Sequence, residues 1–411
     1  TFISSEVTYN LRHNMSFKCA WCCRAVHSDC KKELGDNCDR GHHAISVIPP
    51  NCVVVRKGGS RNQKDMVIEA IYAPVDVQRF RPVFVVYNPK SGSGDGELVG
   101  AAFKTRLHPV QVLDITRIQL RNTFAWMEKH PERKIRLLIA AGDGTIMNVL
   151  DEVDELTNKP EISILPVGTG NDLSRILGWG SQTNGRRVAT DDLLKHIQEA
   201  EVQMVDRWKV TIEGTRRPRV TKTISMTNYF SIGVDACVTF GMQKTRESVP
   251  KCLSSRLTNK ILFFLYGTAD LFMRKCRGLH RKIELRLDGV DIPLPELEGI
   301  IFLNIPSWGA GVKPWQDNSD DETFQPQKVD DGLFEIFGVQ SSFHIAKLQV
   351  KAGIGMSAIM RIGQGREAVI KVRNGSVFMQ HDGEAFEQTE SVVTITHKSQ
   401  VPMLKSLNPL D

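Results

Sequence analysis

The stretch Ile135–Leu150 constrains the fold of this chain more than any other part of the sequence. Its apolar run stops at Gly142-Asp143-Gly144-Thr145, and apolar residues at helical spacing follow. This pattern predicts a buried strand, a tight turn and a helix. The same pattern recurs over residues 162–177, where the apolar run stops at Gly168-Thr169-Gly170-Asn171-Asp172. Two such units in succession place both glycine loops at one edge of a parallel sheet.

Glycine loops between a strand and a helix have the chemistry of a phosphate site. Without a Cβ, the backbone N–H groups approach phosphate oxygens closely, and the next helix directs its positive end at the same anion. Either loop alone fits an ordinary turn or helix cap, but the two together favour one phosphate-bearing ligand between them. Because an ionised Asp143 would repel a polyphosphate, the loop also implies Mg²⁺.

A third junction of this kind opens the α/β region. The apolar strand Pro82–Tyr87 precedes Asn88-Pro89-Lys90 and a Gly/Ser turn whose glycine spacing does not fit a Walker P-loop. Strands and helices alternate to about residue 205, which predicts a doubly wound parallel sheet. After Asp206–Lys209 the segments become short and alternating, and this predicts a second, β-rich sandwich domain.

Composition limits the partners. The net charge of +6 suits an anionic membrane surface or a nucleotide better than a nucleic acid, because no basic stripe is interleaved with aromatic residues. No apolar run approaches the length needed to span a bilayer. The chain begins at Thr1 rather than Met, so we expect any targeting or membrane-spanning segment to lie upstream.

The N-terminal cysteines have the spacing of zinc ligands. Disulfides are the alternative, but the later cysteines are scattered like buried thiols of a reducing compartment, which favours zinc. The expected ligands are Cys19, Cys22, His27, Cys30 and Cys38.

Several motifs along the chain resemble, in order, those of the diacylglycerol kinases. The resemblance covers about Cys19 to Lys398 and is closest to the epsilon isoform. The motifs that carry it are Ala141–Thr145, Gly168–Asp172, Leu177–Gly180, Asn228–Asp235, Leu297–Ile301, Asp330–Leu333, Arg361–Gln364 and Asp382–Glu384.

The resemblance implies an α/β nucleotide domain followed by a β-sandwich, with the active site in the cleft between them. The cysteine spacing is similar to the second half of a C1 zinc module, but Phe2 and Ser5 stand where its first cysteine pair is expected, so we interpret it as a truncated or degenerate remnant. The expected divisions are 1–48 for the partial C1 module, 49–79 for a linker, 80–215 for the catalytic domain, 216–400 for the accessory domain and 401–411 for a tail.

The resemblance also implies ATP and Mg²⁺ as cofactors, in addition to zinc. Thr116 is a nucleotide contact on this basis, although a plain strand-end residue is the alternative. The expected nucleotide-binding residues are Asn88, Pro89, Lys90, Thr116, Gly142, Gly144, Thr145, Gly168, Thr169, Gly170, Asn171, Asp382 and Gly383.

Glu384 is the expected general base, because in the family the Glu of this motif takes the substrate proton. On sequence alone the Asp-Gly-Glu motif would more often be a surface hairpin turn. In the related sphingosine kinases the Asp of the Gly-Asp-Gly motif takes the role of base, so Asp143 is the rival. We assign Asp143 to Mg²⁺ and nucleotide and Glu384 to the proton.

The segment Lys328–Leu333 resembles a structural Mg²⁺ site of bacterial relatives. Its expected ligands are the Asp331 carboxylate and the carbonyl groups of Lys328 and Leu333, with a solvated Asp-Asp-Gly turn as the alternative. Two further stretches could meet a membrane: the basic and apolar helix Ser255–Arg277, and the loop Trp308–Trp315 with its two tryptophans. Packing on a core is the alternative for both.

The sequence therefore predicts an ATP-dependent lipid kinase that phosphorylates 1,2-diacylglycerol at the cytosolic face of membranes, bound peripherally, with no nucleic-acid partner. A sphingoid or ceramide kinase is one alternative. The other is a lipid-surface binding protein that has lost catalysis, because the C1 module is broken and because Ala141 stands where the family usually has glycine, which would strain the loop if that position needs a positive φ.

Overall fold

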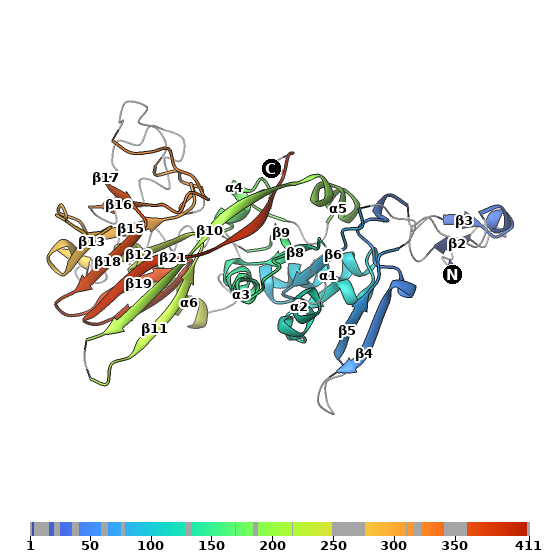
Figure 1. Cartoon of the computed structure of the whole chain (residues 1–411), viewed down its shortest axis with the longest axis horizontal. Helices are drawn as coiled ribbons and strands as arrows, with labels where there is room; N and C mark the ends of the chain where they lie inside the picture. Colours follow the sequence, from blue (N-terminus) through green and yellow to red (C-terminus); the bar gives the residue numbers. More distant parts are fainter. Residues whose placement is uncertain are drawn as a thin grey trace.

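The computed structural model describes residues 2–3, 16–19, 25–34, 41–58, 65–74, 79–128, 134–168, 170–183, 188–215, 217–248, 276–309, 311–315, 323–340 and 360–408. It shows an elongated molecule in which an α/β part and a β-rich part lie side by side, joined by two long strands (Figure 1). The N-terminal strands lie at the far end of the α/β part. The short 3-10 turns of the described residues are Asp29–Leu34, Gly41–His43, Pro50–Cys52, Ser91–Gly94, Pro109–Gln111 and Leu279–Arg281.

The α/β part contains the predicted parallel sheet. Its strands lie in the order β9, β8, β6, β7, and all three pairs are parallel. The strands are β6 (Val83–Tyr87), β7 (Val112–Asp114), β8 (Arg136–Ala141) and β9 (Glu161–Pro166), and the helices are α1 (Asp95–Lys104), α2 (Leu120–Glu128), α3 (Asp143–Asp154), α4 (Asp172–Ile176) and α5 (Thr190–Glu199). Every residue of β6 and β8 is buried, as expected of central strands covered on both faces.

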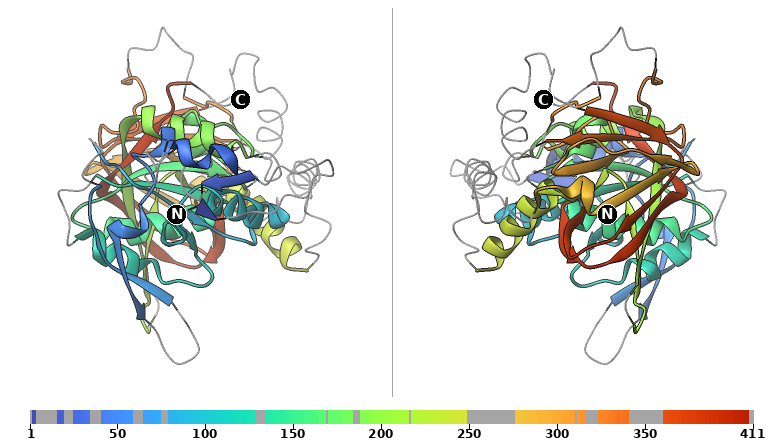
Figure 2. Two further views of the ribbon diagram at one scale, coloured as in Figure 1. Left: turned by 90° about the vertical axis from the view of Figure 1, so that its right-hand side faces the viewer. Right: turned by 90° about the vertical axis from the view of Figure 1, so that its left-hand side faces the viewer.

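The β-rich part is built from antiparallel strands in two sheets, with apolar side chains between them. One sheet has the order β17, β16, β15, β12, β19, β20, so β20 is an edge strand. Helix α6 (Val234–Ser248) packs against β12, β19 and β20 and projects beyond them (Figure 2). The strands of this sheet are β12 (Tyr229–Gly233), β15 (Gly299–Leu303), β16 (Phe334–Val339), β17 (Met360–Gly365), β19 (Val377–His381) and β20 (Glu384–Gln388).

The other sheet continues into the α/β part. Strand β21 pairs antiparallel with β18 and β10, and near its end Met403 pairs in parallel register with Ile162 of β9. One sheet therefore runs through both parts of the molecule. Its further strands are β10 (Glu201–Gly214), β11 (Thr221–Met226), β13 (Ile283–Leu287), β14 (Val290–Ile292), β18 (Glu367–Val372) and β21 (Ser391–Lys405).

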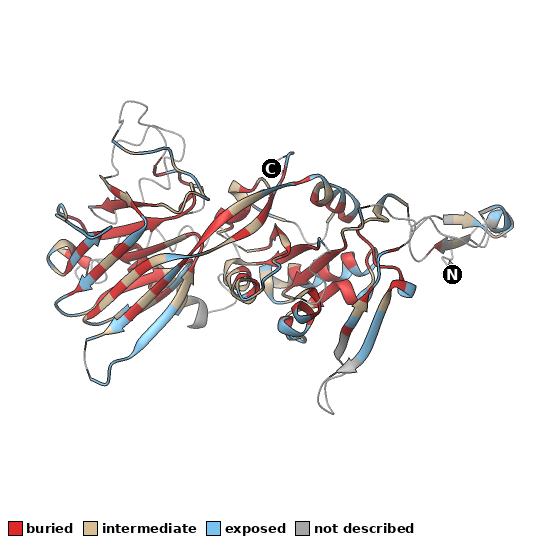
Figure 3. Cartoon of the chain, viewed as in Figure 1, coloured by how far each residue is buried: buried red, intermediate tan, exposed pale blue. Residues whose placement is uncertain are grey.

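Two regions differ from the expected linker and tail. Residues 401–405 are the end of β21, because they complete the pairing with β10. Within residues 49–79, the hairpin of β4 (Val53–Gly58) and β5 (Asp65–Ile71) contributes Ile68 and Ile71 to the α/β core. Figure 3 shows β4 mostly exposed and β5 with buried residues on the side of the α/β core.

The N-terminal segment forms a small sheet of β1 (Phe2–Ile3), β2 (Ser16–Cys19) and β3 (Ala25–His27). Two of the expected zinc ligands, Cys22 and Cys38, lie outside the described residues. Cys19 and His27 belong to opposite ends of the β2–β3 pairing, since Ser16 is the partner of His27. Among the described residues, no group of three or more His, Cys, Asp or Glu side chains is placed to hold a metal ion.

The two stretches considered for membrane contact have different outcomes. Most of Ser255–Arg277 lies outside the described residues. Trp308 and Trp315 are both buried: Trp308 packs edge-on against Phe337, and Trp315 against Phe324. The loop is therefore packed on the core, which was the alternative reading. In the part of the chain that the structure describes, no helix is long and apolar enough to cross a bilayer.

Candidate functional site

Three loops meet at the carboxyl ends of β6, β8 and β9. The Asn88 side chain, after β6, donates from Nδ2 to Thr145 Oγ1 at 2.9 Å, and Gly142 N donates to Ser91 Oγ at 3.4 Å. Asn88 Oδ1 accepts from Lys90 N within its own loop. The Asn88 amide thus orders the loop after β6 and also joins it to the loop after β8. The structure thus brings together the three glycine loops that were predicted separately.

The close approach of the loops after β8 and β9 requires glycine. A Cβ on Gly168 would lie 2.8 Å from Gly142 Cα, and a Cβ on Gly170 would lie 2.6 Å from Asp143 Oδ2. Both distances are shorter than real Cβ contacts, so a larger residue at 168 would separate the loops, and one at 170 would displace Asp143 or the loop. The open backbone between them has the character of an anion site.

Asp143 is fixed by the loop after β9. Its Oδ2 accepts from Asn171 N at 3.2 Å, and Asn171 has a left-handed backbone with φ of 56°. The Asn171 amide donates to the carbonyl groups of Gly168 and Ser181. Thr169 lies outside the described residues.

Ala141 is not strained. It is the last residue of β8, is fully buried, and is not among the described residues with positive φ. The concern that alanine would tilt the phosphate loop is therefore removed, because the position does not need a glycine conformation.

Glu384 reaches the phosphate loops from the β-rich part. A Cβ on Gly144 would lie 3.2 Å from Glu384 Oε1, so this carboxylate lies against the first turn of α3. Glu384 begins β20, more than two hundred residues along the chain from Gly144. The expected base and the expected nucleotide loop thus meet between the two parts.

The turn before Glu384 is anchored by Asp382. Its carboxylate accepts from the backbone N–H groups of Thr227, Asn228 and Tyr229 at 2.7, 2.7 and 3.0 Å. Burial raises the pKa of Asp382 to about 6, against the lowering effect of those N–H donors. The Asp382 side chain is therefore committed to the fold, and its role in nucleotide binding stays a prediction, as does that of Gly383.

The site carries a negative field. The pKa of the Tyr229 phenol is raised, first by burial and then by four carboxylates, including Asp143, Asp172 and Asp382. Asp235 and Asp382 are bound by protein donors, so Asp143, beside the glycine loops, is the carboxylate placed to meet a divalent cation. The residues present therefore fit Mg²⁺ with a polyphosphate, with Asp143 as the group closest to the glycine loops.

Arg207 joins α3 to the β-rich part. It is fully buried, and its guanidinium pairs with Asp154 at 2.9 Å and contacts Asp151 and Thr227 Oγ1. Arg207, together with Lys398 and Ser399, lowers the pKa of Asp154 to about 2, despite the opposing effect of burial. Because Asp154 ends α3 and Asp143 begins it, Arg207 fixes the helix that carries the Gly-Asp-Gly-Thr motif.

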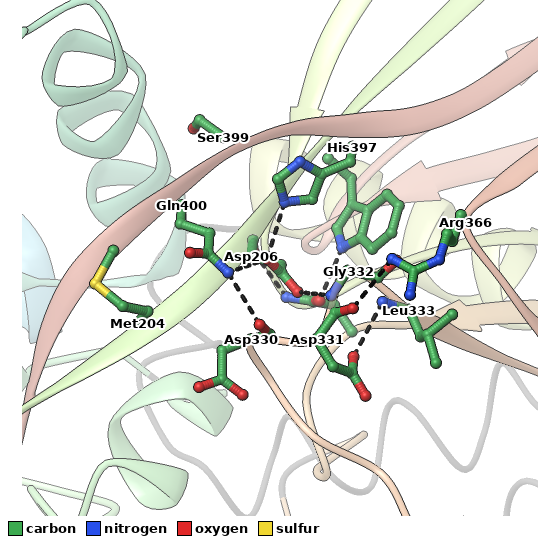
Figure 4. Close-up of polar contacts among 12 residues, drawn as sticks. Met204, Asp206, Asp330, Asp331, Gly332, Leu333, Arg366, His397, Ser399 and Gln400 are labelled. Atoms are coloured by element: carbon green, nitrogen blue, oxygen red, sulfur yellow. Dashed lines mark hydrogen bonds and ion pairs between the residues drawn. The ribbon is translucent and has the colours of Figure 1, made fainter. Parts of the chain in front are cut away.

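The expected structural Mg²⁺ loop is ordered by protein contacts (Figure 4). Asp331 Oδ1 accepts from Leu333 N at 3.0 Å, and Arg366 Nη1 donates to the Asp331 carbonyl at 3.2 Å. Asp206 Oδ2 accepts from Gly332 N at 2.7 Å. Burial raises the pKa of Asp331, and the negative charge of Asp206 adds to the effect. A Mg²⁺ site made by the Asp331 carboxylate and the carbonyl groups of Lys328 and Leu333 therefore stays a prediction.

The remaining predicted residues are exposed or half-buried. Thr116 follows β7, is exposed, and donates from Oγ1 to Asp114 Oδ1 at 2.7 Å. Lys90 is exposed and Pro89 is half-buried. Their nucleotide contacts stay predictions.

Sequence reasoning missed the residues that support the site. Arg207 was seen only as part of the boundary at Asp206–Lys209, and Gln380 and Gln243 carried no motif. The sequence offered no clear signal for Arg207, because its strand also carries the exposed Lys209 two positions on.

Two family models match the chain. The model described as the diacylglycerol kinase catalytic domain matches residues 82–206, and the one described as the diacylglycerol kinase accessory domain matches residues 225–385. The glycine loops fall in the first match and Glu384 in the second.

Individual relatives of the chain are also diacylglycerol kinases by name. Diacylglycerol kinase 1 of Arabidopsis thaliana is 33% identical over 365 residues, which are 85% of this chain and 49% of that protein. Diacylglycerol kinase zeta of Rattus norvegicus is 30% identical over 442 residues, which are 97% of this chain and 46% of that protein. The chain thus spans about half the length of the curated relatives it matches.

The fold is also found among solved structures. A crystal structure of a candidate diacylglycerol kinase from Bacillus anthracis str. Sterne has a TM-score of 0.51 and 18% identity, and the match covers 81% of this chain and all of the other. Catalytic and accessory matches in succession, together with the order of the motifs, lead to one assignment. The chain belongs to the diacylglycerol kinase family.

Proposed function

We propose that this chain transfers the γ-phosphoryl group of ATP to the free hydroxyl of 1,2-diacylglycerol and so produces phosphatidic acid and ADP. The observation that carries the proposal is the position of Glu384 Oε1 against Gly144, where a carboxylate from one part of the fold meets the phosphate loops of the other. The names of the relatives support the choice of substrate.

Glu384 acts as the general base. Its carboxylate takes the proton of the lipid hydroxyl while that oxygen forms a bond to the γ-phosphorus and the bond to the ADP oxygen breaks. Glu384 is exposed, so a substrate hydroxyl can reach its carboxylate. Asp143 is turned toward Asn171 N, which supports a role at the nucleotide rather than as the base.

The three loops hold the nucleotide. The glycine loops after β8 and β9 bind the phosphates, and the N-terminus of α3 adds its positive end. Mg²⁺, when bound with ATP, neutralises charge on the phosphate oxygens. Asn88 and Thr145 keep the loops at a fixed separation through their hydrogen bond.

Further expectations belong to the same proposal. They are zinc binding by the N-terminal C1 remnant, likeness to the epsilon isoform, the domain divisions given above, and peripheral binding to the cytosolic face of a membrane. The sphingoid or ceramide kinase remains the alternative acceptor class, and a catalytically impaired binding protein remains the alternative without chemistry.

Labelled-phosphate transfer from ATP in mixed micelles tests the proposal, with diacylglycerol, sphingosine and ceramide offered as separate acceptors. We expect phosphatidic acid from the parent chain and a loss of at least about 100-fold in Glu384→Gln. Glu387→Gln, the same change three residues along β20, is the matched control and should keep full activity. Transfer to sphingosine or ceramide alone would favour the alternative acceptor, and ATP binding with no transfer would favour the binding protein.

A further inference from the structure

Glu384 is flanked by two backbone N–H groups that are both bound by glutamine side chains. Gly383 N donates to Gln380 Oε1 at 2.8 Å, and Ala385 N donates to Gln243 Oε1 at 3.2 Å. The residue before the base and the residue after it are thus each held by an amide oxygen. Neither glutamine belongs to the nucleotide loops.

The Gln243 side chain accepts a hydrogen bond from a backbone N–H group of the edge strand β20. β20 is the outer strand of its sheet, and Ala385 lies opposite Gln380 of β19. In an antiparallel ladder the N–H groups of alternate residues point outward at the edge, where no strand accepts them. Gln243, on α6, supplies the acceptor for Ala385, so the helix fixes the strand directly after the base.

Gln380 is oriented from the first turn of the same helix. Its Nε2 donates to Asp235 Oδ2 at 3.2 Å and to Ser231 Oγ at 3.1 Å, and Ser231 Oγ donates to Asp235 Oδ2 at 2.6 Å. All three side chains are buried. Since an ionised carboxylate only accepts hydrogen bonds, Asp235 keeps Nε2 of Gln380 on its own side and Oε1 toward Gly383.

We propose that α6 is the positioning element for the catalytic base, and that Gln243 and Gln380 are positioning residues which fix Glu384 from both sides. The inference rests on the proposed function, since it takes Glu384 as the base. A carboxylate at the start of an exposed edge strand would otherwise sample several directions, and proton transfer requires one of them. Asp235 acts one step further away, through Gln380.

Kinetics of Gln243→Met and Gln380→Met test the proposal. We expect kcat to fall by about 10- to 100-fold, with KM for ATP and for diacylglycerol changed by less than about 3-fold, because the base is displaced while the three glycine loops of the α/β part keep their contacts. Gln243→Glu keeps an oxygen acceptor and should restore most of kcat. Gln198→Met, which removes two hydrogen bonds of α5 far from the turn, is the matched control and should behave like the parent.

A double-mutant cycle separates positioning from a general structural effect. If the glutamines act through Glu384, then Gln243→Met should cause no further loss in the Glu384→Gln background. An equal loss in both backgrounds would overturn the proposal, as would an unchanged kcat in both single variants.

Hydrogen exchange gives a readout that does not depend on activity. Backbone amides over residues 382–388 should exchange about 10-fold faster in Gln243→Met and in Gln380→Met than in the parent or in Gln198→Met. Should the parent show no phosphate transfer, the proposed function fails, and the exchange data still decide whether the two glutamines hold the turn. Unchanged exchange in both variants overturns the inference whatever the activity. Gln380 is buried, so Gln380→Met could fail to fold. In that case the result for Gln243→Met alone tests the inference.

Discussion

The carboxylate of Glu384 lies against the backbone of Gly144, so that a Cβ at Gly144 would be 3.2 Å from Glu384 Oε1. This contact joins the two parts of the molecule at the point where the chemistry is proposed. Gly144 belongs to the first turn of α3, while Glu384 begins an edge strand of the β-rich part. The residue type at 144 therefore controls how close the base comes to the phosphate loop.

Gly144→Ala should lower kcat by about 10-fold, because the new methyl group lies within a tight contact distance and moves the Glu384 carboxylate by a few tenths of an ångström or more. The measurement is steady-state phosphate transfer to diacylglycerol with both KM values. Gly214→Ala, where a Cβ meets only an ordinary contact of 3.5 Å, is the control. Equal kcat in Gly144→Ala and the parent would argue against Glu384 as the base.

Gly170→Ala should weaken nucleotide binding rather than proton transfer. Its Cβ would lie 2.6 Å from Asp143 Oδ2, so either Asp143 or the loop after β9 must move. We expect the Kd for Mg-ATP to rise by at least about 10-fold, as measured by calorimetry in the absence of lipid. A Kd equal to that of the parent would remove Asp143 from the nucleotide site and reopen its role as the base.

The glycine loops could be predicted from sequence because apolar periodicity and small residues are local signals. The pairing of β21 with β9 could not, since Met403 and Ile162 are 241 positions apart and no local preference connects them. The packing of Trp308 and Trp315 could not be predicted from sequence either, because a tryptophan in a glycine-rich loop suits a bilayer interface and a protein core alike. Glu384 itself was identified through family resemblance, whereas Gln243 and Gln380 become visible only with the edge strand in place.

The loop around Asp331 provides a test with metal. If the Asp331 carboxylate binds Mg²⁺, addition of Mg²⁺ without nucleotide should raise the midpoint of thermal unfolding of the parent, with a smaller rise in Asp331→Asn. Asp330→Asn, at the neighbouring exposed carboxylate, is the matched control. Equal stabilisation of all three proteins would place the bound ion elsewhere and leave the loop as a turn ordered by Arg366 and Asp206.

The buried carboxyl of Glu335 should make stability depend on pH. Burial raises its pKa to about 8, against the effect of hydrogen bonds from Gln364 and Gln327. The folded state therefore binds the proton more tightly than the unfolded state, and the stability that this gives is complete below the ordinary Glu pKa and is lost as pH rises toward 8. Over that window this group should lower the free energy of unfolding by about 1.4 kcal/mol for each pH unit.

Glu335→Gln isolates this contribution, because a neutral amide keeps the shape of the side chain and does not titrate. Urea unfolding at pH 5, 6, 7 and 8 should show the variant gaining stability relative to the parent at each step, with the largest gain at pH 8. Asp235 and Asp382, whose pKa values are raised by burial to about 6, remain in both proteins and cancel in the comparison. A difference between the two proteins that is constant across the series would mean that Glu335 is ionised throughout, and that Gln364 and Gln327 stabilise its charge more than burial opposes it.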